Sequence, residues 1–227
     1  MRIYFNGDSN VAGTELDNPT HDGMAYQLAR RFDNANGNNK FLNANIINDS
    51  KPGAGNDRIY DTTLNYLSNF QKPDLVIIGW TDFSRIQWFL DEQFYEINHI
   101  GVHIDLPDEY QSRYQHWKDN VQRSGMWNVV MSEYWHNKIY NLHSILNYRK
   151  IPHLFFNAFD YFKIDSKYQS SWNNCYLDPY SNNLVYTKYC ESKGYPEITP
   201  GWHHYPPEAH KHWADLMYNH IKQNNIL

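Results

Sequence analysis

The chain lacks features that mark several common classes of protein. It has only two cysteines, Cys175 and Cys190, in 227 residues, which excludes a disulfide-rich scaffold and a zinc site with four cysteine ligands. The two cysteines either form one disulfide or remain free thiols. No run of 18 apolar residues occurs, and the N-terminus has no basic region followed by an apolar one. We therefore expect neither a membrane span nor a signal peptide.

Positive charge is also scarce. The chain has 20 Lys and Arg residues against 25 Asp and Glu residues, which gives a formal net charge of -5 and a pI of about 6.2. Proteins that bind nucleic acid through phosphates need a basic patch or stripe. We expect a small or neutral partner and no nucleic acid.

Aromatic residues, in contrast, are abundant. They make up 17% of the chain, with 19 Tyr and 8 Trp, although the mean hydropathy is only −0.78. This composition fits an amphipathic groove whose rings stack on sugars, and it equally fits a core packed with tyrosine. Both interpretations stay open at the level of sequence.

Short apolar runs alternate with segments of helical periodicity along the chain. This alternation predicts parallel strands joined by crossover helices, and 227 residues suffice for one such α/β domain. The predicted strands cover residues 2–8, 43–49, 73–80 and 151–159, and the predicted helices cover residues 21–32, 58–70, 126–149 and 206–223.

Some helical details follow from the same periodicity. Thr20 is the expected cap of the first helix. The helix over 126–149 is expected to bury the stripe Trp127, Val130, Met131, Tyr134, Leu142 and Ile145, and the last helix is expected to bury Ala209, Trp213, Leu216 and Ile221.

Two segments do not fit the alternation of strands and helices. Residues 86–125 have weak periodicity and are interpreted as an insertion or lid. Residues 160–200 are interpreted as a long surface excursion near a site.

Gly7, Asp8 and Ser9 directly follow the first predicted strand. Ligands of open parallel sheets bind beyond the carboxyl ends of the strands. The glycine allows a sharp turn there, and the serine hydroxyl is presented above the sheet edge. Ser9 is therefore placed like a nucleophile, whereas the alternative is that Asp8 and Ser9 only cap the next turn.

Three other short motifs fall at corresponding positions. Gly53, followed by Gly55 and Asn56, comes just before a predicted helix, where backbone N–H groups can face an anion. Thr81 lies in "GWTD" after the third predicted strand. His204 comes just before the last predicted helix.

This set of motifs, in this order, resembles the SGNH hydrolases, also called GDSL esterases and lipases, over nearly the whole chain. The resemblance implies one domain over 1–227 with a three-layer α/β/α sandwich and a flavodoxin-like parallel sheet. It also implies that Ser9 is the nucleophile and that His204 is the general base. The oxyanion hole would comprise Ser9, Gly53 and Thr81. No cofactor or metal is implied.

The chain departs from the family pattern at two places. Thr81 stands where the family has Asn, and its hydroxyl reaches less far than a carboxamide, although the G-W-T block is similar to that of phage-encoded members. Gly201 stands three residues before His204, where the family has the Asp that orients the base. The orienting group is a carboxylate from elsewhere, a backbone carbonyl, or absent.

Other residues near these motifs receive supporting roles. His204 is preferred to its neighbour His203 because its ten-residue spacing to Ala214 is similar to the family spacing. Asp8 is expected to hold the turn before Ser9. Asn56 lies beside the second motif. Arg85, in the stretch "GWTDFSR" that contains Thr81, either adds positive charge at that third motif or anchors the lid.

These roles predict acyl transfer through Ser9, with His204 as base and no cofactor. The substrate is expected to be a small-molecule or glycan ester, with a preference for glycan O-acyl esters, and the location to be cytoplasmic or virion-associated. The alternative is a catalytically weak or inactive module of the same fold that binds glycans. A metal site made by the histidines at 203, 204, 210 and 212 is disfavoured because His210 and His212 lie on different helix faces.

Overall fold

A parallel sheet forms the centre of the molecule. The computed structural model describes residues 1–35, 46–99, 106–123 and 125–227. Within these ranges the sheet has four strands in the order β2-β1-β3-β6. They are β1 (Ile3–Asn6), β2 (Ile46–Asn48), β3 (Leu75–Trp80) and β6 (His153–Asn157). All three pairings are parallel, which confirms the predicted sheet. Residues 43–45 of the second predicted strand lie outside the described residues.

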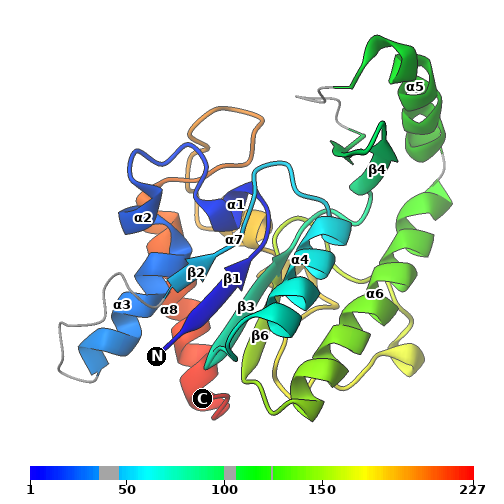
Figure 1. The fold of residues 1–227 in the computed structure, drawn as a ribbon. Coiled ribbons are helices and arrows are strands. Elements are labelled where there is room, and N and C mark those ends of the chain that lie inside the picture. Colours follow the sequence, from blue (N-terminus) through cyan, green and yellow to red (C-terminus); the bar gives the residue numbers. More distant parts are fainter. Residues whose placement is uncertain (36–45, 100–105, 124) are drawn as a thin grey trace.

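Helices cover both faces of this sheet (Figure 1). On one side lie α3 (Met24–Ala35) and α8 (Pro207–Gln223), and on the other lie α4 (Asn56–Asn69) and α6 (Gly125–Tyr148). The predicted three-layer α/β/α architecture is therefore confirmed. Among the described residues, no helix is both long and apolar enough to cross a membrane.

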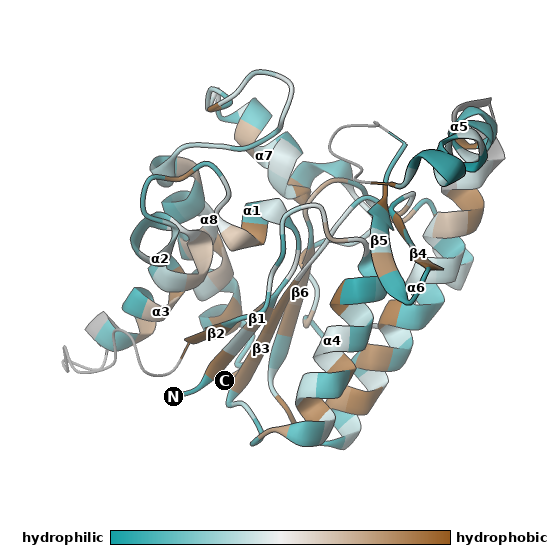
Figure 2. Cartoon of the chain, turned by 45° about the horizontal axis from the view of Figure 1, so that its top comes forward, coloured by the Kyte–Doolittle hydropathy of each residue, from teal (hydrophilic) through white to brown (hydrophobic). Residues whose placement is uncertain are grey.

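The sheet is apolar because helices bury both of its faces. Every residue of β3 is buried, as expected for a continuous apolar run in a parallel sheet. Figure 2 shows the central strands largely in brown, between helices that carry both teal and brown residues. One core cluster includes Phe5, Leu28 and Trp213. A second, on the opposite face, includes Trp80 and Trp135.

The remaining helices and strands complete the fold. They are α1 (Ser9–Ala12), α2 (Pro19–Asp22), the antiparallel hairpin β4 (Ile86–Leu90) and β5 (Gln93–Ile97), α5 (Asp108–Arg123), α7 (Tyr186–Ser192) and the 3₁₀ turns η1 (Ser166–Tyr168) and η2 (Asn182–Leu184). The hairpin and α5 fall within the predicted insertion 86–125, of which residues 100–105 and 124 lie outside the described residues. They extend away from the sheet (Figure 1) and share a small apolar cluster of their own.

Two predictions about helices, one about a cap and one about a buried face, are wrong in detail. Thr20 lies inside α2, which begins after Asn18, and its hydroxyl donates to the Asn18 side chain. In α6, Val130 and Tyr134 are 54% and 44% exposed. Among the side chains of α6 that the structure describes, the apolar ones that are fully buried are Trp135, Ile139, Leu142 and Leu146. Because α6 carries apolar residues on several faces, its periodicity alone does not identify the buried face.

The segment 160–200 is not only a surface excursion. Tyr176 and Val185 form parallel bridges to Phe155 and Asn157 of β6, so parts of this segment extend the sheet beyond its fourth strand. Tyr186 and Cys190 are fully buried.

The predicted buried stripe of α8 differs at one position. Met217 is fully buried, whereas the predicted Leu216 is only half-buried. Both cysteines are free thiols.

Candidate active site

Ser9 is the first residue of α1 and follows the carboxyl end of β1. Asp8 caps this helix by accepting a hydrogen bond from Asn10 N at 2.9 Å. A side chain at Gly7 would place Cβ only 2.4 Å from Val11 Cγ2, so the turn admits glycine alone. The N–H of Ser9 lies in the first turn of the helix, where no intrahelical acceptor exists. It is thus free to bind an anion.

A buried hydrogen-bond network fixes the residues behind Ser9. Asp8, Asn56 and Thr81 are fully buried. The Thr81 hydroxyl donates to Asp8 Oδ2 at 2.7 Å, while the Asn56 side chain accepts from Thr81 N at 2.9 Å and donates to Thr81 O at 3.2 Å. A hydroxyl has one proton to donate. The expectation that the Thr81 hydroxyl faces an oxyanion therefore differs from the structure, where that proton is directed to Asp8.

Arg85 lies beside the same network. Its Nη1 is 4.0 Å from Asp8 Oδ2, and its guanidinium lies 4.8 Å from the centre of the Phe159 ring. Its buried Nε has no hydrogen-bond partner among the residues that the structure describes. The guanidinium thus brings a positive charge next to Asp8, the residue before the candidate nucleophile, and retains an unused donor.

His204 has a carboxylate partner that the sequence motifs did not identify. Its Nδ1 lies 2.9 Å from Oε2 of Glu15, and both side chains are largely buried. Glu15 is six residues after Ser9, in the turn that ends α1. The hydrogen bond from Thr14 N to Ser9 O, 2.9 Å long, ties this turn to the nucleophile. The candidate nucleophile, base and acid thus belong to two adjoining segments.

The backbone on both sides of this pair is unusual. Glu15 has φ of 68° and His203 has φ of 57°, a left-handed conformation that costs a non-glycine residue about 1–3 kcal/mol. A hydrogen bond from Ile198 N to His204 O, 2.8 Å long, closes the loop that presents His204. Such strained residues cluster at functional sites, because the surrounding structure must hold them there.

The structure explains why Gly201 is not the orienting acid. Gly201 has φ of 86°, which disfavours any residue with a side chain, and a Cβ at this position would meet no atom within 4 Å. Its N–H donates to Glu197. Glu197 also lies beside the neighbouring His203, with Oε1 2.7 Å from Nδ1. The two adjacent histidines therefore have separate carboxylate partners.

Gly53 lies in an exposed turn between β2 and α4. It has φ of 78°, and the turn is tied to the nucleophile loop by a hydrogen bond from Lys51 N to Gly7 O at 3.1 Å. Glu96 of β5 accepts a hydrogen bond from Gly55 N at 2.8 Å, and burial raises the pKa of this carboxyl. The hairpin β4–β5 is thereby anchored to the loop that carries Gly53.

The four histidines between residues 203 and 212 have separate partners. His203 and His204 face the glutamates described above. Met24 N donates to His210 Nδ1 at 3.3 Å, and burial lowers the pKa of His210 to about 4. His212 contacts the hydroxyl of Tyr195. Within the described part of the chain, these histidines do not make a group of converging metal ligands.

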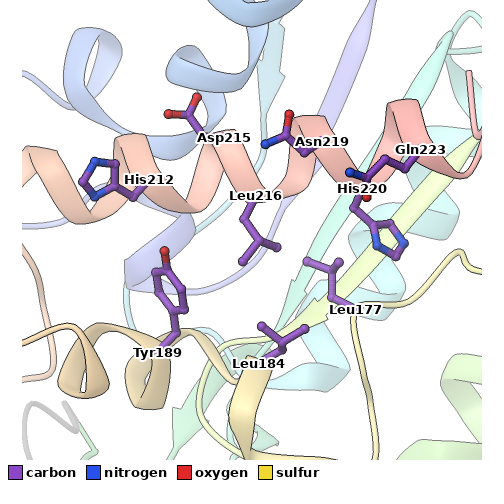
Figure 3. Close-up of a pocket in the computed structure, with 9 residues that line it drawn as sticks. All are labelled: Leu177, Leu184, Tyr189, His212, Asp215, Leu216, Asn219, His220 and Gln223. Carbon is purple, nitrogen blue, oxygen red and sulfur yellow. The ribbon is translucent and has the colours of Figure 1, made fainter.

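A hollow of about 480 Å³ lies between α7 and α8 (Figure 3). Three of its polar side chains have partners inside the protein. Asp215 pairs with Arg31, His212 with Tyr195, and His220 Nε2 with Asn174 O at 2.7 Å. Since it contains neither Ser9 nor His204, we place the candidate chemistry at the sheet edge instead.

Comparisons with known proteins agree with this architecture. No family model matches the chain, and no curated protein matches its sequence. Among solved structures, it resembles the psychrotrophic esterase EstA from Pseudoalteromonas sp., solved inhibited by monoethylphosphonate, with a TM-score of 0.53, 13% identity, and coverage of 98% of this chain and 97% of EstA. It also resembles TesA, with a TM-score of 0.54, 12% identity and coverage of 99% of both chains. The chain therefore shares the α/β/α fold of these two proteins along almost its whole length.

Proposed function

We propose that the protein is a serine ester hydrolase in which Ser9 is the nucleophile, His204 is the general base and Glu15 orients that base. The observation that carries the proposal is the 2.9 Å contact between His204 Nδ1 and the Glu15 carboxylate, in the turn that follows Ser9. This contact supplies the function of the acid missing at Gly201. The fold shared with the esterase EstA supports the same reaction class.

The Glu15 contact determines which nitrogen of His204 acts as the base. An ionised carboxylate only accepts hydrogen bonds, so His204 Nδ1 carries the proton and Nε2 is left with a lone pair. Nε2 removes the Ser9 hydroxyl proton as Oγ attacks the ester carbonyl. The resulting imidazolium, stabilised by Glu15, protonates the leaving alcohol. Water then attacks the acyl-enzyme by the same route and releases the acid.

The negative charge on the carbonyl oxygen needs donors that are already in place. We assign this role to the N–H groups of Ser9 and Gly53 and to the positive charge of Arg85. Thr81 and Asn56 act one step further away, because their hydrogen bonds fix Asp8 and hence the turn that presents Ser9. Asp8 itself caps α1.

A glycan O-acyl ester is the substrate class that the surroundings of His204 favour. Trp202 is 42% exposed, and its ring lies 6.4 Å from the His204 ring in an edge-on arrangement. Phe159 lies between Arg85 and His203, with ring-centre distances of 4.8 and 6.0 Å. The exposed ring of Trp202 beside the base suits stacking on a sugar ring.

The proposal is tested by a phosphonate probe that mimics the tetrahedral intermediate. We expect the purified protein to gain one phosphonyl group, seen as a single mass increment of the intact chain, because only an activated serine attacks such phosphorus centres. Ser9→Ala should gain none. Ser192→Ala, which removes a serine exposed at the end of α7, should react like the parent.

Two results would contradict the assignment. One is the absence of an adduct in protein whose near-ultraviolet circular dichroism shows a folded core, which would favour a glycan-binding role without catalysis. The other is an adduct of equal yield in Ser9→Ala, which would identify another nucleophile.

Replacing Arg85 tests the electrostatic part of the site. Arg85→Met keeps the apolar stem over Phe159 but removes the charge, and we expect kcat for ester hydrolysis to fall by about 10²-fold with little change in KM, as for the loss of one oxyanion donor. Arg85→Lys keeps the charge and should retain more activity. An unchanged kcat in Arg85→Met, measured on protein with an unchanged melting temperature, would show that Arg85 only anchors the lid.

A further inference from the structure

A second cluster of chemically active side chains lies at the opposite end of the sheet from Ser9. His153 is the first residue of β6, whereas Ser9 follows the carboxyl end of the parallel strand β1. Near His153 lie His143 of α6 and Cys175. Their ligand atoms, one from each side chain, all lie within 4.8 Å of one another. The ester hydrolysis proposed above uses none of these three residues.

The backbone holds all three side chains in place. Cys175 belongs to the segment that extends the sheet beside β6. Its carbonyl accepts from Phe155 N at 2.8 Å, and its N–H donates to Trp172 O at 2.8 Å. The Trp172 ring in turn packs 5.5 Å from the His143 ring. The cluster is therefore assembled by three fixed segments and not by one mobile loop.

Hydrogen bonds assign the proton positions of the two imidazoles. His153 Nδ1 lies 2.9 Å from Ile151 O, and since a carbonyl only accepts, Nδ1 carries the proton and Nε2 has a free lone pair. That lone pair faces His143 Nδ1 at 2.8 Å. His143 Nε2 in turn lies 2.9 Å from the side-chain amide of Asn147. Each imidazole thus has an outer partner on the side away from the cluster.

These outer partners are the kind that metal-bound histidines use. A histidine bound to a metal passes its other N–H to a carbonyl, carboxylate or water. Ile151 O already accepts from His153 in this way. For His143, rotation of the Asn147 amide by 180° presents its oxygen to Nε2–H and leaves Nδ1 with a lone pair.

The cluster is also accessible from outside. His153 and Cys175 line a hollow of about 270 Å³, whose other walls include Asn147, Asn173 and Asn224. This hollow admits an ion and supplies water. Two imidazole nitrogens and one thiolate are ligands that zinc accepts, whereas magnesium and calcium prefer oxygen.

We propose that His143 Nδ1, His153 Nε2 and Cys175 Sγ bind a zinc ion, with water from the adjoining hollow as the fourth ligand. Binding transfers the thiol proton of Cys175 to the solvent and shifts the proton of His143 from Nδ1 to Nε2. The two nitrogens separate to about 3.3 Å, the spacing set by a tetrahedral zinc with bonds of about 2.0–2.1 Å. The ion ties α6, β6 and the 170s segment together.

Cobalt(II) is the probe, because it reports its ligands by absorption. Untagged, metal-free protein should bind one equivalent with intense tetrahedral visible bands and a thiolate-to-cobalt charge-transfer band in the near ultraviolet, and zinc should displace it. Cys175→Ser should lose the charge-transfer band. Cys190→Ser, which removes the other thiol, and His116→Gln, which removes an exposed histidine on α5, should keep it.

Zinc should also raise the melting temperature of the parent by about 5–10 °C at a concentration on the order of 100 times its Kd, and that of Cys175→Ser by much less. The proposal is wrong if one equivalent of cobalt gives no charge-transfer band, or if the band persists in Cys175→Ser. Circular dichroism confirms that each variant is folded. Phosphonate labelling at Ser9 is read separately, so failure of one proposal leaves the other intact.

Discussion

Replacing Ser9 with alanine is expected to lower kcat for ester hydrolysis by about 10⁶-fold, the loss seen when the nucleophile of a serine hydrolase is removed. The reason is that no other group then forms the acyl-enzyme, so only direct attack by water remains. Residual rate above the uncatalysed reaction is expected from the N–H donors of the oxyanion site, which are backbone groups that the substitution leaves in place. Steady-state kinetics on an activated acetyl ester measures the effect.

Structural damage should contribute little to this loss. The cap of α1 is Asp8, which Ser9→Ala does not change, and alanine is well accepted inside a helix. We expect the melting temperature to stay within a few degrees of the parent, and Ser192→Ala to keep the parental kcat. Substantial hydrolysis by pure Ser9→Ala would contradict the assignment of Ser9 as the nucleophile.

The order of strands and helices could be read from the sequence because local pattern and burial agree. The run at 75–80 is apolar throughout, and the structure buries all of it between two helical layers. In contrast, the hairpin β4–β5 was not predicted. Its strands include exposed residues such as Phe89 and Phe94, so they do not follow the alternation of a half-buried strand.

The buried face of α6 could not be read for a related reason. Apolar and aromatic residues occur all around this helix, and the choice of Trp135 over Tyr134 depends on contacts with β3, β6 and the 160–180 segment. Such contacts join residues far apart in the sequence. Periodicity cannot report them.

The acid that we propose as the orienting group was missed because it comes from a different segment than the proposed base. Glu15 and His204 are 189 positions apart, and nothing in the local sequence distinguishes Glu15 from an ordinary exposed glutamate. The weak signal was the absence of an acid at Gly201, which left a carboxylate from elsewhere as one of three open alternatives, beside a backbone carbonyl and no orienting group. The geometry supplies the physical reason, since a side chain at Gly201 would require a left-handed backbone and would meet no neighbouring atom.

The second large effect is expected for Glu15→Gln, which keeps the size of the side chain but removes its charge. We expect kcat/KM to fall by about 10³–10⁴-fold, because the amide no longer stabilises the imidazolium and allows the unproductive tautomer of His204. Steady-state kinetics on an activated acetyl ester measures the change. A kcat/KM equal to that of the parent, in folded Glu15→Gln, would contradict the orienting role.

Glu197→Gln is the matched control, because Glu197 faces the neighbouring His203 in the same loop at a similar distance, 2.7 Å against 2.9 Å for the Glu15 pair. We expect it to leave kcat/KM within a few-fold of the parent. If Glu197→Gln were the damaging variant and Glu15→Gln were silent, His203 and Glu197 would be the base and its orienting acid. The comparison therefore decides between the two adjacent histidines, which the spacing to Ala214 alone does not.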